Sequence, residues 1–85
     1  MKHANELALQ SLQDLLACLR TLPGLVERKP GIFYVKSKAY LHFHEDAVGL
    51  FADVRLSDGD FERFRVSTTG EQKLLMKLLA KNRGA

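Results

Sequence analysis

Four short segments between Ile32 and Val66 alternate apolar with polar side chains, and this alternation constrains the fold more than any other feature of the chain. The segments are rich in β-branched and aromatic residues, a composition that favours β-strands. They span Ile32–Lys36, Ala39–His44, Val48–Leu56 and Phe61–Val66. Because only short turns separate them, we expect consecutive segments to pair as an antiparallel meander.

Leucine-rich segments on both sides of the meander predict two amphipathic helices. From Asn5 to Leu22 leucines recur at spacings of three and four, and Pro23-Gly24 should end this helix. Thr68 and Glu71 have the spacing of a capping box at the start of the second helix. One face of the second helix should carry the leucines Leu74, Leu75, Leu78 and Leu79. We expect residues 82–85 to fray.

The order of these elements predicts the fold class. The 85 residues suffice for one domain, which we expect to span residues 1–85. The order α-β-β-β-β-α predicts an α+β two-layer sandwich, in which a four-stranded antiparallel meander carries two helices on one face. The opposite face of the sheet, called the open face below, is then left uncovered.

Strand alternation divides the side chains between the two faces of the sheet. The core face is expected to carry Phe33, Val35, Leu41, Phe43, Val48, Leu50, Ala52, Val54, Phe64 and Val66. The open face is expected to carry Tyr34, Lys36, Tyr40, His42, His44, Phe51, Asp53, Arg55, Arg63 and Arg65. An exposed aromatic and basic patch usually marks a contact surface, so the second set contains the candidate ligand-binding residues.

Two turns are specified by the sequence. Lys29-Pro30-Gly31-Ile32 fits a type II turn, with Gly31 at the position that needs a positive φ. The loop between the third and fourth strands must contain an odd number of residues to keep their apolar sets on one face. Ser57-Asp58-Gly59 supplies three, with Gly59 in the left-handed position of a bulge. This register places Asp53 opposite Arg63, where the two can pair.

The open face favours binding over catalysis. We expect a non-enzymatic binding or interaction module that uses this face for a protein partner or for self-association. Nucleic acid is an alternative ligand, because bases stack on aromatic rings and phosphates pair with cations, although no RNP-type motif is present. The net charge of +3 is concentrated in residues 66–85, where cations suit a helix C-terminus or an anionic surface.

His42 and His44 form the most suggestive motif, because residues two apart on a strand point the same way. They offer an alternative function, a metal-binding or small-molecule site. Zinc sites use at least three protein ligands. We expect no third ligand, since His3 lies in an N-terminus that should fray, and the predicted register puts Asp53 opposite Lys38, out of reach of His42. The sequence therefore predicts no tightly bound metal and no cofactor.

Other chemistry-bearing patterns are missing from the sequence. It has no nucleophile elbow, no flanking pair of carboxylates and no glycine-rich phosphate loop, so we do not expect an enzyme. Cys18 should face the core, where a thiol is generally inert. As the single cysteine it forms no intramolecular disulfide, which suits a cytoplasmic protein. No apolar run reaches the roughly 18 residues of a membrane span.

Part of the chain resembles the luciferase-domain family of small bacterial proteins. The similar motifs are Leu22-Pro23-Gly24, Ile32-Phe33-Tyr34-Val35, Leu41-His42-Phe43-His44-Glu45-Asp46 and Ala52-Asp53-Val54-Arg55. The segment from Val35 to Tyr40 is also similar to a hairpin of the MmcQ/YjbR-like proteins. Both groups are largely uncharacterised, and a flavin luciferase needs a far longer barrel, so the resemblance does not imply light emission. It implies that His42, His44 and Asp53 are the positions of interest.

Overall fold

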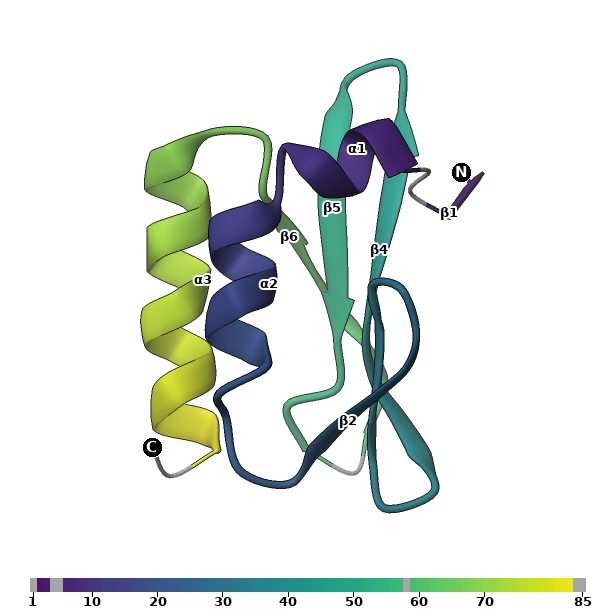
Figure 1. Ribbon diagram of the computed structural model, residues 1–85, viewed down its shortest axis with the longest axis vertical. Helices are drawn as coiled ribbons and strands as arrows, with labels where there is room; N and C mark the ends of the chain where they lie inside the picture. The colour runs from purple at the N-terminus through teal and green to yellow at the C-terminus, as the bar shows by residue number, and fades with distance from the viewer. Residues whose placement is uncertain (1, 4–5, 58, 84–85) are drawn as a thin grey trace.

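The computed structural model describes residues 2–3, 6–57 and 59–83, and it shows a two-layer α+β sandwich (Figure 1). Two helices lie side by side over one face of an antiparallel sheet, and a short helix crosses near one end of it (Figure 1). The elements are β1 Lys2–His3, α1 Glu6–Gln10, α2 Gln13–Leu19, β2 Leu25–Lys29, β3 Ile32–Val35, β4 Lys38–Asp46, β5 Gly49–Val54, β6 Glu62–Arg65 and α3 Thr69–Asn82. The predicted fold class is confirmed.

The sheet has one more strand in its main path than the sequence predicted. Strands β2 to β6 are neighbours in chain order and all pair antiparallel, as a meander requires. Strand β2 was missed because Leu-Val-Glu-Arg-Lys has only two apolar residues and shows no sustained alternation. Strand β1 pairs with β4 at Lys2↔Glu45 and His3↔His44, so the backbone of His3 is paired where fraying was expected.

The N-terminal helix is broken where one helix was predicted. Ser11 N bonds to Ala8 O at 3.2 Å and Leu12 N to Leu9 O at 3.0 Å, which are the tight bonds of a helix end. Ser11 Oγ also donates to Ala8 O at 2.7 Å. The carbonyl of Ser11 instead accepts a bond of 3.3 Å from the buried side chain of Gln72 on α3. A tertiary contact thus accompanies the break, and the leucine spacing gave no sign of it.

Helix α3 begins as predicted, and its exposed and buried faces differ in part from the prediction. Thr68 Oγ1 accepts from Glu71 N at 3.1 Å and Thr68 N donates to the Glu71 carboxylate at 3.0 Å, which is the capping box. Leu75 and Leu79 are buried, whereas Leu74 is 70% exposed and was wrongly assigned to the apolar face. Residues 84–85 of the segment expected to fray lie outside the described residues.

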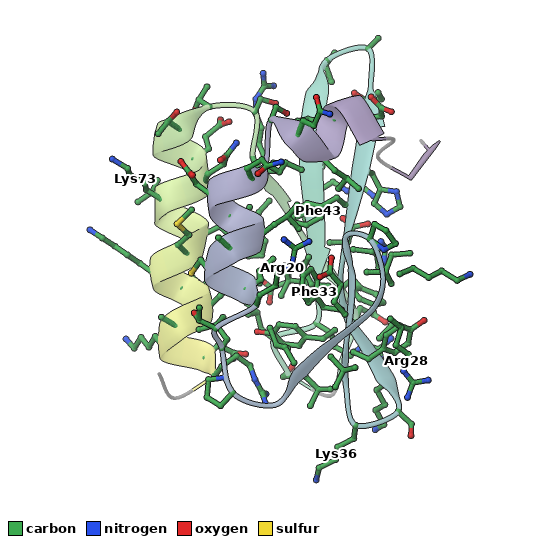
Figure 2. All side chains as sticks on the ribbon, viewed as in Figure 1. Arg20, Arg28, Phe33, Lys36, Phe43 and Lys73 are labelled. Carbon is green, nitrogen blue, oxygen red and sulfur yellow. The ribbon has the colours of Figure 1, made fainter. Side chains whose placement is uncertain are left out.

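The core lies between the helices and the sheet, with Phe33 and Phe43 among its largest fully buried side chains (Figure 2). Most of the predicted core residues belong to it or pack against it. Val48 is an exception at 64% exposure, because Asp46 pairs with Gly49 and leaves Val48 in the two-residue turn. Phe43 therefore lies opposite Ala52.

Tyr40 is buried, although strand alternation predicted it on the open face. The register of β3 with β4 shifts between Phe33 and Tyr34, since Phe33 pairs with Leu41 and Tyr34 with Ala39. Tyr40 is the extra residue at this bulge, and a bulge re-aims the side chain it carries. Its hydroxyl donates to Asn82 Oδ1 on α3 at 2.7 Å.

Two turn predictions had different outcomes. Gly31 has φ +77°, as the predicted type II turn requires. The register of Asp53 opposite Arg63 is also confirmed. The β5–β6 ladder ends at Val54↔Glu62, however, so the connection is longer than three residues, and Gly59 does not adopt the predicted left-handed conformation. Asp58 lies outside the described residues.

None of the helices in the described part of the chain combines the length and apolar character needed to cross a membrane.

Candidate metal centre

The pairing of β4 with β5 brings two histidines and an aspartate together on the open face. His42 lies opposite Asp53, and His44 points to the same face because it is two residues further along β4. One ring nitrogen of each histidine and one carboxylate oxygen of Asp53 all lie within 4.8 Å of one another. These three residues are called the His-His-Asp cluster below.

The observed strand register contradicts the reason for expecting no third metal ligand. The predicted register placed Asp53 opposite Lys38, out of reach of His42. Asp53 instead lies opposite His42, because β4 runs on to Asp46 and a turn of only two residues follows. Asp46 Oδ1 accepts a 2.9 Å hydrogen bond from Val48 N, which holds that tight turn. The prediction of no tightly bound metal therefore loses its geometric basis.

Asp53 is 8% exposed and is the anionic centre of the cluster. Arg63 donates from Nε to Asp53 Oδ1 at 2.8 Å and from Nη2 to Oδ2 at 3.0 Å, while His44 Nε2 lies 3.1 Å from Oδ2. The hydrogen bonds from Arg63 lower the pKa of Asp53, and burial opposes them without overcoming them. The charges of Arg63 and of the two histidines lower this pKa further. The carboxylate is thus ionised at neutral pH.

The histidine rings pack against each other and against Phe61. The rings of His42 and His44 meet edge to face, with centroids 4.6 Å apart, and the ring of Phe61 lies 4.8 Å from that of His42. The guanidinium carbon of Arg55 lies 4.5 Å from the centroid of Phe61. The His44 side chain is 13% exposed, so water reaches little of its ring. The cluster is therefore only partly open to solvent.

The spacing of the cluster fits a small cation with modest adjustment. Zinc holds nitrogen and oxygen ligands at about 2.0–2.1 Å, so the ligand atoms of a tetrahedral site are about 3.3 Å apart. The His44–Asp53 distance of 3.1 Å already matches this spacing. No pair in the cluster exceeds 4.8 Å, so the widest needs to close by at most about 1.5 Å. Arg63 would have to release one carboxylate oxygen, and its half-exposed side chain can move into solvent.

Only some of the predicted open-face residues converge on the cluster. Phe51 lies opposite His44, and its ring is 5.9 Å from the guanidinium carbon of Arg63. Arg65 faces Phe51 across the ladder but lies 3.4 Å from a carboxylate oxygen of Glu71.

The remaining predicted residues lie elsewhere. Tyr34 sits at the β2–β3 edge, where the guanidinium carbon of Arg28 is 5.1 Å from its ring (Figure 2 labels Arg28). Lys36 is exposed in the β3–β4 turn, and Tyr40 is in the core. The open face is therefore less uniformly basic than predicted, because Arg63 and Arg65 are paired with carboxylates.

Phe61 is the member of the site that sequence reasoning missed. It was expected to begin the fourth strand, but β6 begins at Glu62 and the connection before it brings Phe61 against His42. An aromatic residue next to a glycine-containing loop was the only available signal, and such residues are common without any role in a site.

Comparison of the chain with models of known families, with curated proteins and with solved structures finds no match in any of the three. The resemblance to the luciferase-domain and MmcQ/YjbR-like proteins stays a prediction.

Proposed function

We propose that this protein is a binding module whose open face holds a divalent transition-metal ion, with His42, His44 and Asp53 as the protein ligands. The observation that carries the proposal is the convergence of their three ligand atoms within 4.8 Å. Two imidazoles and a carboxylate are a ligand set that zinc accepts, with a fourth position left for water or for a group from a partner.

The electrostatics of the cluster support a cation. Asp53 is held ionised, so it needs no deprotonation before it can bind a metal. Placement on two hydrogen-bonded strands also keeps the three ligands close without the metal, which lowers the ordering cost of binding. Arg63 compensates the carboxylate in the metal-free state and competes with the incoming ion.

The same arrangement disfavours nucleic acid as the ligand of this face. Arg63 and Arg65 were expected to contact phosphates, yet each lies within ion-pair distance of a carboxylate. A phosphate would have to displace Asp53 or Glu71, which lowers the gain from each contact. A protein partner that supplies the fourth metal ligand remains compatible with the predicted interaction module.

The direct test is metal binding by the purified chain after removal of adventitious ions on a chelating resin. Titration with Zn²⁺, followed by calorimetry and by the histidine ring resonances, should show one ion per chain. His42→Ala and His44→Ala should each weaken binding by at least about tenfold, because even outer-shell changes cost 10–100-fold. Glu62→Gln, which removes an exposed acid from β6, should leave the affinity unchanged.

A third histidine makes one further control necessary. His3 pairs through its backbone with His44, so His3→Ala is titrated in parallel. Zinc binding that survives both His42→Ala and His44→Ala, or that is lost only in His3→Ala, would contradict the proposal.

A further inference from the structure

A cavity of about 450 Å³ lies at the end of the sandwich where the β3–β4 turn meets the C-terminal end of α3. Figure 1 shows these two segments at the same end of the molecule, and Figure 2 labels Lys36 on the turn. Three segments line the cavity, residues 35–40, 55–57 and 82–83. None of the residues of the His-His-Asp cluster lines it, so it is a separate feature.

Hydrogen bonds tie the walls of the cavity together. Tyr40 donates to Asn82 Oδ1 at 2.7 Å, and Asn82 Nδ2 donates to Leu56 O at 3.0 Å, so one side chain links all three segments. Burial raises the pKa of Tyr40, against the opposing effect of Arg83, which keeps the phenol protonated as the donor. The cavity therefore exists without a ligand, and binding does not have to organise its walls.

The residues around the cavity are basic. Lys36, Lys38, Arg55 and Arg83 line it, and none of its other described lining residues is acidic. Within the described residues, neither Lys36 nor Lys38 has a hydrogen-bond or ion-pair partner for its ammonium group. Lys36 also has φ +57°, in the left-handed region that a residue other than glycine adopts only at a cost in conformational energy. Unpaired charge and backbone strain together are features that proteins retain at binding sites.

The apolar part of the lining indicates what else the ligand must carry. Val35, Ala39 and Leu56 contribute apolar surface beside the ring of Tyr40, and the guanidinium carbon of Arg83 lies 5.5 Å from that ring. The C-terminal end of α3 is the negative end of its dipole, so it disfavours an anion at that wall. The anionic group therefore belongs on the Lys36–Lys38 side, with the body of the ligand over the apolar wall.

We propose that this cavity binds a small organic anion, an apolar body that carries a carboxylate or a phosphate. The volume lies within the 300–1,000 Å³ range of small-molecule sites, which combine apolar walls with a few polar groups in the same way. Nothing in the proposed metal centre requires this second site.

The test uses phenyl phosphate and benzoate as separate probes of the two anionic groups, in metal-free buffer, with amide resonances of a ¹⁵N-labelled sample as the readout. We expect at least one probe to give saturable shifts confined to residues 35–40, 55–57 and 82–83, with a dissociation constant of about 1 mM or lower. The probe that binds more tightly identifies the preferred anionic group. Inorganic phosphate should bind more weakly than phenyl phosphate, because it lacks the apolar body.

Surface variants separate the proposal from nonspecific attraction. The double variant Lys36→Ala with Lys38→Ala should weaken binding at least about threefold. Both lysines are exposed at the cavity, and their charges attract an anion over roughly a Debye length. Lys73→Ala with Lys77→Ala removes the same charge from exposed positions on α3 that do not line the cavity, and it should weaken binding much less. Figure 2 shows Lys73 toward the end of the helix that is far from the cavity.

Three results would overturn the proposal. Absence of saturable shifts from either probe up to about 10 mM would show that the cavity has no useful affinity. Equal shifts from benzylamine, a cation of similar shape, would show that charge is not recognised. Equal weakening by the two lysine pairs would show that only the net charge matters.

Discussion

Arg63 is the residue on which the state of the metal centre depends. It makes two hydrogen bonds to Asp53, yet half of its side chain is exposed. Because the guanidinium is half exposed, solvent screens its charge and limits what the pair contributes to stability. The same pair matters more for binding, since it occupies both oxygens of the only carboxylate in the cluster.

Arg63→Gln should therefore tighten zinc binding by about tenfold, because the ion no longer has to displace hydrogen bonds to a charged group, which contribute about 1.5–3 kcal/mol. Arg65→Gln is the matched control, because Arg65 lies on the same strand and pairs with Glu71 instead. Calorimetry with Zn²⁺ measures both variants against the wild type. Weaker binding in Arg63→Gln would show that the arginine supports the site and does not compete with the ion.

At the scale of elements, an ion pair joins the end of α2 to the β2–β3 hairpin. Arg20, at the C-cap of α2, donates from Nε and Nη2 to Glu27 on β2 at 2.7 and 3.1 Å. Glu27 also accepts a 3.0 Å bond from Gly31 N in the β2–β3 turn. This contact anchors β2, an edge strand whose own sequence gives little indication of β-structure.

Glu27 should make the stability of this hairpin dependent on pH. The hydrogen bond from Arg20 lowers the pKa of Glu27 in the folded state, with smaller help from Gly31 and from the charge of Arg20, and burial opposes this. A depressed pKa contributes stability above the unfolded value, about 4.3, and the contribution is lost as pH falls through the folded value.

Urea unfolding of wild type and Glu27→Gln at pH 7 and pH 3 checks this. The difference in unfolding free energy between the two proteins should be larger at pH 7 and shrink at pH 3. Glu62→Gln, an exposed acid for which no such partner exists among the described residues, should show no comparable pH effect. A difference that grows on acidification would contradict the assignment.

At the scale of the whole molecule, the last turn of α3 is fastened to the sheet. Asn82 connects Tyr40 on β4 with the backbone of Leu56, and Arg83 Nε donates to Pro23 O at 3.4 Å. Residues far apart in sequence therefore meet at one end of the sandwich, at the cavity described above. Residues 82–83 belong to the segment expected to fray, yet they are hydrogen-bonded to the rest of the fold.

Tyr40→Phe should destabilise the fold by about 0.5–1.5 kcal/mol, and Asn82→Ala by about 1–3 kcal/mol, because the first loses one hydrogen bond and the second two. If the contact is direct, the double variant should lose less than the sum of the two. Tyr34→Phe, at the distant β2–β3 edge, is the control and should not couple with Asn82→Ala. Strict additivity of Tyr40→Phe and Asn82→Ala in urea unfolding would contradict the link.

Features that depend on a few neighbouring residues were predictable from the sequence. The capping box at Thr68 and Glu71 and the positive φ of Gly31 are local, because each is specified by chemistry within four residues. Leucine spacing predicted the helical layer, and strand alternation predicted the antiparallel meander and the register of Asp53 with Arg63. That last register was predictable because burying arginines on the core face would be costly.

Features that depend on contacts between distant segments were decided only by the tertiary structure. The bond from Gln72 to Ser11 accompanies the break in the leucine-rich helix, and the bulge in β4 turns Tyr40 into the core toward Asn82. These contacts join residues tens of positions apart, whose proximity no local pattern encodes.

The metal centre combines both kinds of information. The spacing of His42 and His44 on one strand was visible in the sequence, because alternation alone aims both rings the same way. The third ligand depended on where β4 ends. Alternation allows any shift of two residues in the register, and the short turn after Asp46 selects the one that brings Asp53 beside His42. The sequence thus determined which residue types line the open face, and tertiary pairing decided which of them meet.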